Sequence, residues 1–130
     1  MRIRQLFSGP AALFIAILTL AACGLTGPAH QAPPAGTVAI DMGLHSYGPD
    51  NVSIRVGQTV TWRNTSIVTH SVTADPARSP KAALPPGVPA FDSGDVRAGE
   101  VFSRTFTVPG TYRYYCTHHD GMVGTITVTR

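Results

Sequence analysis

Tyr112–Gly124, with the sequence YRYYCTHHDGMVG, is the stretch on which the fold and the chemistry of this chain both depend. In it, Cys116 is followed by His119 three residues later and by Met122 three residues after that. Thiolate and thioether are soft ligands and imidazole is borderline, so this trio suits copper better than magnesium, calcium or manganese. The spacing predicts three ligands of a metal site, and a fourth ligand must come from elsewhere in the chain.

Short runs rich in β-formers surround this stretch, and apolar and polar residues alternate in them with the period of two typical of half-buried strands. The predicted strands are Thr37–Met42, Asn51–Val56, Thr59–Asn64, Ser71–Thr73, Val101–Val108, Thr111–Cys116 and Gly124–Thr129. Gly57-Gln58 predicts a hairpin turn between the second and third of these. Many short strands without an amphipathic helix favour an all-β fold, an antiparallel β-sandwich.

The segment Asp75–Ala90 contains five prolines, which exclude a central strand. It predicts a long loop, with a helical turn near Pro80–Leu84. Strand parity places Cys116 on the buried face together with Tyr112, and it places Tyr115 on the opposite face, toward solvent.

The N-terminal sequence predicts that the protein is exported from the cytoplasm. Arg2 and Arg4 precede the apolar run Leu13–Ala22, which is too short to span a bilayer and is typical of a signal peptide. Leu20-Ala21-Ala22-Cys23 resembles the lipobox of bacterial lipoproteins, and this resemblance implies that Cys23 is lipidated after cleavage. A retained anchor and ordinary cleavage that leaves a free thiol are the alternatives. We expect residues 1–22 to be the signal peptide, 23–36 a flexible tether rich in Pro and Gly, and 37–130 the folded domain.

Charge and cysteine content narrow the function classes. The chain has ten Lys plus Arg and seven Asp plus Glu, and removal of a signal peptide with Arg2 and Arg4 leaves eight against seven, a formal charge of +1. No run of basic residues remains, so we expect no nucleic-acid partner. The two cysteines could form one disulfide in an exported protein. Lipidation of Cys23 would exclude that bridge and leave Cys116 as a single thiol.

His70 is the best candidate for the missing ligand, because it lies between two predicted strands whose ends can meet Cys116 at one edge of a sandwich. The two residues are 46 positions apart, so the site would assemble only on folding. Taken singly, Cys116, His70 and Met122 could equally be a buried thiol, a loop histidine and a core side chain. His118 falls outside the three-residue step and is expected to face solvent, and His45 is a weak candidate in an early loop.

Several motifs together resemble the cupredoxins, the blue copper proteins, and most closely their plastocyanin and amicyanin group. The matching motifs are Asn64…Thr69-His70-Ser71-Val72, Phe91-Asp92-Ser93-Gly94, Pro109-Gly110-Thr111-Tyr112 and Cys116-x-x-His119-x-x-Met122-x-Gly124. The resemblance implies a Greek-key β-sandwich of about seven to eight strands that holds one type 1 copper. It also implies that His70, Cys116 and His119 are the strong ligands and that Met122 is the weak axial ligand.

One position departs from the resemblance. An Asn commonly follows the first His ligand in this family, where its amide bonds the Cys sulfur and its side chain ties two loops together. Ser71 keeps the amide but has a shorter side chain, so the sequence leaves the loop tie open and predicts an effect on the copper potential.

The expected function is a one-electron carrier that cycles between Cu(I) and Cu(II), not an enzyme, because four protein ligands leave no position for a substrate. We expect a monomer, exported and lipid-anchored, facing the periplasm or the cell exterior, with redox proteins as partners. Pro85–Pro89 and Val123 are expected to form an apolar docking patch near His119. Copper storage or delivery through the same ligands is the alternative, and a metal-free structural or adhesive sandwich is the third hypothesis.

Overall fold

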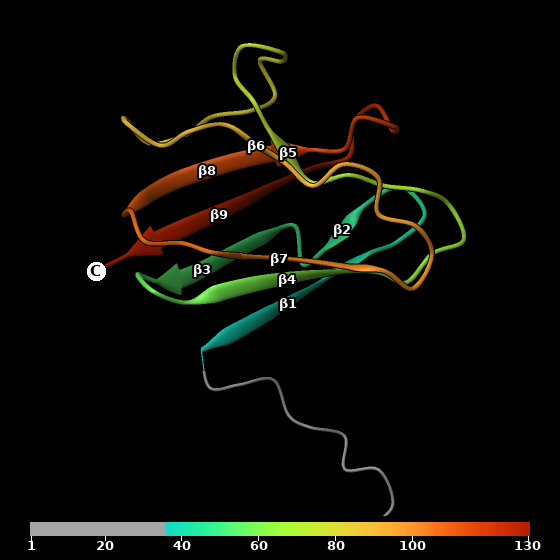
Figure 1. The fold of residues 1–130 in the computed structure, drawn as a ribbon, viewed down its shortest axis with the longest axis horizontal. Coiled ribbons are helices and arrows are strands. Elements are labelled where there is room, and N and C mark those ends of the chain that lie inside the picture. Colours follow the sequence, from blue (N-terminus) through green and yellow to red (C-terminus); the bar gives the residue numbers. More distant parts are fainter. Residues whose placement is uncertain (1–35) are drawn as a thin grey trace, which may run out of the picture. The chain divides into compact units, whose positions relative to one another are not determined.

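The computed structural model describes residues 36–130, which contain nine strands and form a β-sandwich (Figure 1). The strands are β1 (Thr37–Met42), β2 (Tyr47–Gly48), β3 (Asn51–Arg55), β4 (Thr59–Asn64), β5 (Thr73–Ala74), β6 (Phe91–Asp92), β7 (Val101–Thr105), β8 (Gly110–Tyr115) and β9 (Val123–Thr129). One sheet has the order β2-β1-β4-β7 and the other has the order β3-β9-β8-β5-β6. Among these residues, the structure contains no helix with the length and hydrophobicity needed to cross a membrane. The predicted all-β sandwich is confirmed.

The sheets are mixed, whereas the sequence predicted antiparallel pairing. β1 pairs with β4 in parallel, and β3 pairs with β9 in parallel. The predicted hairpin at Gly57-Gln58 is also wrong. β3 belongs to one sheet and β4 to the other, so this turn connects the two layers. Alternation along a strand reports which face is buried, but it does not identify the neighbouring strand.

The core lies between the two sheets and contains the apolar residues that the alternation predicted. From the first sheet, Ile40 and Trp62 are fully buried, and from the second sheet Tyr114 and Ile126 are fully buried. The Trp62 ring centroid is 5.4 Å from that of Tyr114 in an edge-on arrangement, so the two layers are joined through aromatic contact.

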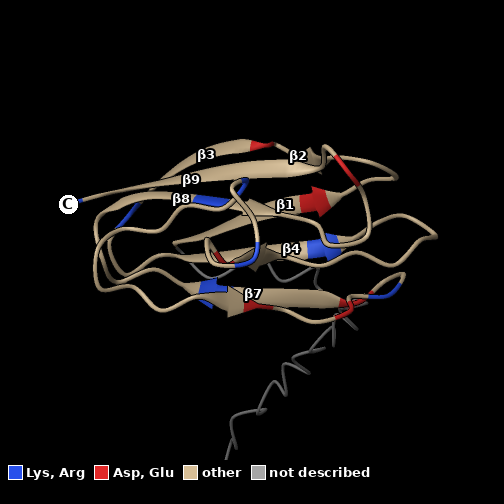
Figure 2. Ribbon diagram, turned by 90° about the horizontal axis from the view of Figure 1, so that it is seen from above, with Lys and Arg blue, Asp and Glu red and all other residues tan. Residues whose placement is uncertain are grey.

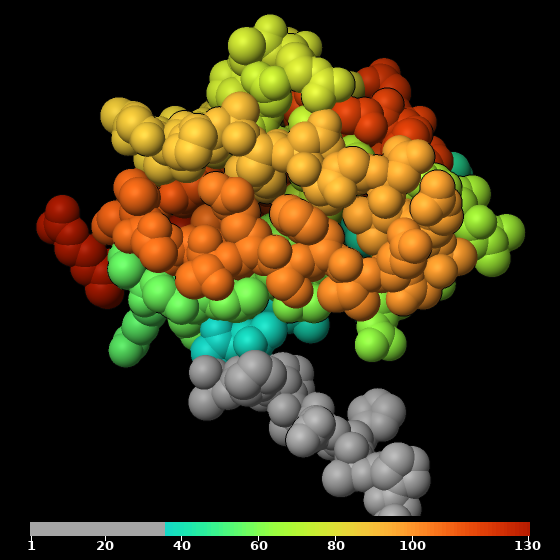
Figure 3. Space-filling model, viewed as in Figure 1, coloured from blue at the N-terminus to red at the C-terminus, as the bar shows by residue number. Residues whose placement is uncertain are grey.

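The segment from Asp75 to Ala90 is the expected loop, but it folds into turns instead of the expected helical turn at Pro80–Leu84. Ala83 exchanges two backbone hydrogen bonds with Arg113 of β8, with N–O distances of 3.1 and 2.8 Å. The segment therefore covers the edge of β8. In the space-filling view it runs in yellow to gold across the molecule, above the orange residues of β7 (Figure 3).

Two predictions are affected by this covering segment. Tyr115 is 7% exposed, so its predicted solvent exposure is wrong. It lies beside Arg78 and Lys81 of the covering segment, which is remote from it in the sequence. Pro85 lies against Gly110, where an added Cβ would be 2.7 Å from the proline Cγ. Gly110 begins β8 and Cys116 follows its end, and six strand residues span roughly 20 Å. The predicted position of Pro85–Pro89 beside His119 is therefore wrong, because Pro85 lies at the far end of β8.

Positions of basic and acidic residues are interspersed along the described ribbon (Figure 2). Among the described residues, ion pairs join Arg78 with Asp92 and Lys81 with Asp120, and His118 Nε2 lies 2.9 Å from the Asp95 carboxylate. The first two pairs tie the covering segment to β6 and to the turn after β8. Exposed pairs of this kind contribute little to stability singly, so their main effect is to fix the position of the cover.

Candidate metal centre

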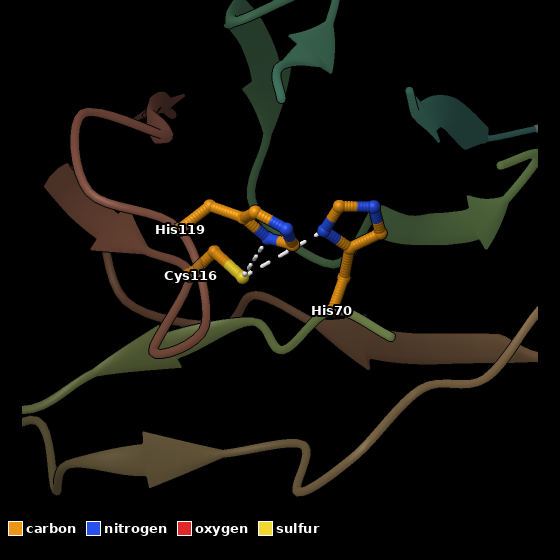
Figure 4. A group of neighbouring side chains, drawn as sticks. All are labelled: His70, Cys116 and His119. Atoms are coloured by element: carbon orange, nitrogen blue, oxygen red, sulfur yellow. Dashed lines mark hydrogen bonds between the residues drawn. The ribbon is translucent and has the colours of Figure 1, made fainter. Parts of the chain in front are cut away.

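Three donor atoms converge at one end of the sandwich (Figure 4). The Cys116 Sγ lies 3.7 Å from Nδ1 of His70 and 3.6 Å from Nδ1 of His119. All three potential ligand atoms lie within 4.8 Å of one another. His70 comes from the segment between β4 and β5, and the other two come from the turn between β8 and β9. The fold therefore brings together the residues that the sequence predicted from two distant segments.

The turn from Cys116 to Met122 is closed by its own backbone. The Cys116 N–H donates to the Met122 carbonyl at 3.0 Å, and the Met122 N–H donates to the His119 carbonyl at 3.4 Å. Gly121 has a φ of +81°, a conformation that costs a glycine little and other residues more. Met122 is 1% exposed and belongs to the same buried apolar cluster as Cys116. Met122 is thus a core residue at the end of the turn that supplies the thiol and one imidazole.

His70 is held in place through both its backbone and its neighbours. It exchanges two backbone hydrogen bonds with Val96, with N–O distances of 3.1 and 2.8 Å. The side chain is fully buried, and this burial lowers the pKa of His70, with the nearby His119 acting in the same direction. A neutral imidazole is the form that can bind a metal, so the surroundings favour the ligand form.

Ser71 makes the loop tie that the sequence left open. Its N–H donates to the Cys116 Sγ at 3.4 Å, as the resemblance implied. Its hydroxyl accepts a hydrogen bond from the Thr117 N–H at 2.9 Å and lies 3.0 Å from the hydroxyls of Thr117 and Thr73. The shorter side chain suffices because Thr117 and Thr73 provide hydroxyls on both sides of it.

Two other histidines of the described residues, His45 and His118, lie outside the donor cluster. His118 pairs through Nε2 with the Asp95 carboxylate at 2.9 Å on the partly exposed surface, in agreement with its predicted orientation. His45 is also exposed, but its ring contacts that of His119 edge-on, with centroids 5.4 Å apart. His45 was only a weak candidate from the sequence, because no spacing signal connects it to His119, 74 positions away. Its place in the structure is that of a packing partner for His119.

A surface hollow of about 540 Å³ lies beside the ligand turn. Its lining residues include Arg78, Lys81, Tyr115, Thr117 and His118. The hollow is open and polar, and it is formed by the covering segment on one side and the turn on the other. Asp120 also lines the hollow, and Arg78 and Lys81 are each paired with an aspartate, so the rim of the metal-binding end carries charges of both signs.

Comparison with known proteins points to one family. The pattern described as "Copper binding proteins, plastocyanin/azurin family" matches residues 35–129. Amicyanin-alpha from Methylorubrum extorquens is 33% identical over 123 residues, which cover 94% of this chain and 95% of that protein. The chain belongs to the plastocyanin/azurin family of copper binding proteins.

Further relatives agree with this assignment. Chloroplastic plastocyanin from Hordeum vulgare is 37% identical over 92 residues, which cover 66% of this chain but only 56% of that protein. Among solved structures, a Cu(I) form of an amicyanin variant matches with a TM-score of 0.62 at 31% identity, covering 72% of this chain and 83% of that chain. Fold class and family, both predicted from the motifs, are confirmed.

The donor set fits the cofactor of this family. Two imidazole nitrogens and a thiolate sulfur, with a buried thioether in the same turn, are the ligand types that hold copper in electron-transfer sites. Copper is therefore the cofactor of this chain, as the sequence predicted. The predicted signal peptide (residues 1–22), the lipidated Cys23 and most of the tether lie outside the described residues.

Proposed function

We propose that this protein is a one-electron carrier in which His70, Cys116 and His119 are the strong copper ligands and Met122 is the weak axial ligand. The observation that carries the proposal is the convergence of two Nδ1 atoms and one Sγ within 4.8 Å, from segments 46 residues apart. Copper held by such ligands exchanges one electron between Cu(I) and Cu(II).

The protein's contribution is a rigid and dry set of ligands. His70 is fully buried and Cys116 is 4% exposed, so water has little access to either donor. Ser71 and Val96 hold the two donors through backbone hydrogen bonds that do not depend on the metal. Ligands that stay in place in both oxidation states keep the structural rearrangement small, which is what rapid electron exchange requires.

His119 is the partly exposed ligand and is the proposed exit for the electron. Apolar residues are exposed in the segments beside it: Leu44 is next to His45, Ile67 precedes His70, and Val123 follows Met122. We propose that redox proteins dock on this apolar surface, and that it replaces the patch expected at Pro85–Pro89. The protein would act as a monomer, since the carrier must release one partner before it meets the next.

We propose further that the protein is exported and anchored by lipid at Cys23, on the strength of Leu20-Ala21-Ala22-Cys23 at the end of the apolar run. Labelling of cells with a radioactive fatty acid tests this step. The wild-type protein should carry the label and sediment with membranes, and Cys23→Ser should lose both properties. A labelled Cys23→Ser protein would refute the assignment.

The decisive test of the copper site is the optical spectrum after addition of Cu(II) to the metal-free protein. An intense blue colour is expected from the bond between thiolate and copper, and Cys116→Ser should abolish it. His118→Ala is the matched control, because His118 lies in the same turn outside the donor cluster, and it should remain blue. A wild-type protein that binds copper without colour would refute the proposal.

Voltammetry separates the carrier from a copper storage or delivery protein with the same ligands. A carrier should cycle reversibly between the two oxidation states and keep its copper in each. Loss of copper on each reduction would favour delivery and would contradict the electron-transfer role. A purified protein without any bound metal would favour a structural sandwich.

A further inference from the structure

The Asn64 side chain, at the end of β4, is almost fully buried and has a fixed orientation. Its Nδ2 donates to the Val68 carbonyl at 2.6 Å and to the Val96 carbonyl at 2.8 Å, and its Oδ1 accepts from the Ser66 N–H at 2.9 Å. Carbonyls can only accept and a backbone N–H can only donate. The flipped amide would lose all three bonds, so the positions of Oδ1 and Nδ2 follow from the backbone.

This amide in turn orients the hydroxyl of Ser66. The Ser66 Oγ lies 2.8 Å from Asn64 Oδ1 and 3.2 Å from the Val68 carbonyl, and both of these atoms are acceptors. The single hydroxyl hydrogen is therefore directed to one of them. The oxygen lone pairs remain free to accept, and one contact they make is with Nε2 of His70, at 3.0 Å.

The contact with Ser66 determines which ring nitrogen of His70 carries the proton. Because Ser66 accepts at this contact, Nε2 must carry the proton, and a neutral ring then has an unprotonated Nδ1. That Nδ1 is the atom that faces the Cys116 Sγ at 3.7 Å. We propose that Ser66, oriented by Asn64, is a positioning residue that fixes His70 in the Nε2–H tautomer and directs the Nδ1 lone pair to the copper position before copper arrives.

The inference rests on the proposed role of His70 as a copper ligand. It adds how the tautomer and orientation of the His70 ring are set before copper binds. A metal-bound histidine commonly donates its other N–H to a group that fixes the tautomer and the ring orientation. In this chain a serine hydroxyl four residues before the ligand contacts Nε2, and the hydroxyl is itself held by a buried amide. Although burial lowers the pKa of His70 overall, a hydrogen bond between the ring and the Gly43 backbone raises it, so Ser66 acts together with this backbone partner. Ser66 is only partly buried, so its hydroxyl can be removed without opening the core.

The test compares the full chain with Ser66→Ala and Ser66→Thr. In the metal-free wild type, ¹⁵N NMR of labelled histidine should show His70 with its proton on Nε2. Ser66→Ala should give a mixture of tautomers, and it should lose its Cu(I) at about 10–100-fold lower concentrations of a competing chelator, the usual loss of metal affinity when such a partner is removed. Ser66→Thr keeps a hydroxyl and should restore both properties. A shift in reduction potential should accompany the alanine variant and be absent from the threonine variant.

The matched control is Ser103→Ala, which removes an exposed hydroxyl that hydrogen-bonds to Thr61 at 2.8 Å. It should leave the tautomer, the copper loss and the potential unchanged. The inference is overturned if wild-type His70 carries its proton on Nδ1, or if Ser66→Ala keeps wild-type tautomer and copper loss. A blue wild type with an unaffected alanine variant refutes this inference alone, whereas a colourless wild type refutes the proposed function.

Discussion

The two segments that build the copper site are held by different means. The turn Cys116–Met122 contributes neighbouring donors and is closed by two backbone hydrogen bonds of its own. The segment Asn64–Ser71 contributes one donor, His70. Besides the backbone pair of His70 with Val96, it is held by side-chain hydrogen bonds that involve Asn64, Ser66 and Ser71. The first segment depends on space for its backbone, and the second depends on buried polar partners. Variants that separate steric from polar effects should therefore act on them differently.

The largest effect is expected at Gly124, directly after the ligand turn. A Cβ at this position would overlap the Tyr114 ring, which is fully buried and cannot move aside. Gly124→Ala should destabilise the metal-free protein by about 3 kcal/mol or more, at the upper end for overpacking. Urea unfolding measures this. Gly48→Ala, where nothing lies within 4 Å of the added Cβ, is the control and should change stability by less than about 1 kcal/mol.

The next largest effect is expected at Asn64, in the other segment. Asn64→Ala removes three side-chain hydrogen bonds, two to the Val68 and Val96 carbonyls and one from the Ser66 N–H, and each such bond contributes about 1 kcal/mol to stability. We expect a loss of about 2–3 kcal/mol in unfolding free energy, since losses at neighbouring groups are not fully additive. The exposed Asn51→Ala is the matched control. Equal stability of the two variants would contradict a polar origin for the order of this segment.

The same difference explains how far the sequence could predict the site. Cys116, His119 and Met122 are close in the chain, so their spacing alone indicated a soft-metal turn. His70 could be added because alternating strands place it at a strand end. The hydrogen bond that His70 Nε2–H donates to Ser66 cannot be predicted from spacing, because a serine in a loop has many possible partners. Ligands that are close together in the chain can be predicted from their spacing, whereas a polar network that forms only on folding cannot.

The fold shows the same limit. Period-two alternation predicted the buried residues of most strands, because burial on one face follows from the residues themselves. It could not predict that Gly57-Gln58 connects two layers, or that the segment around Ala83 covers the edge of β8. Both depend on contacts between residues far apart in sequence. The predictions for Tyr115 and Pro85–Pro89 were wrong because this covering segment was not predicted.

Ser71 joins the two segments, and its substitution should have a smaller effect. Ser71→Ala removes the hydroxyl bonds to Thr117 and Thr73 but keeps the N–H that donates to Cys116. The expected loss of unfolding free energy is about 1 kcal/mol, the usual net value of a side-chain hydrogen bond. The reduction potential should shift because Thr117 follows the thiolate directly. An unchanged potential in a blue Ser71→Ala protein would show that the tie is not needed for the site.

The smallest expected effect lies at the outer end of the same hydroxyl chain, at Asp92. Burial alone would raise the pKa of Asp92, but hydrogen bonds from the Gly94 N–H, the Thr73 hydroxyl and the Arg78 guanidinium outweigh it and hold the pKa below its usual value. A carboxyl with a lowered pKa stabilises the fold above its unfolded pKa of about 3.9, and that stability is lost as the pH falls through the folded value.

The unfolding free energy of the metal-free wild type should therefore decrease below about pH 4 more steeply than that of Asp92→Asn, which cannot titrate at this position. Since the Asp92 carboxylate is 37% exposed, solvent screening keeps the difference small. Urea unfolding at a series of pH values measures both slopes. Parallel curves would show that the hydroxyl chain from Ser71 through Thr73 ends without electrostatic support from Asp92. In that case the remote half of the site would depend on neutral hydrogen bonds alone.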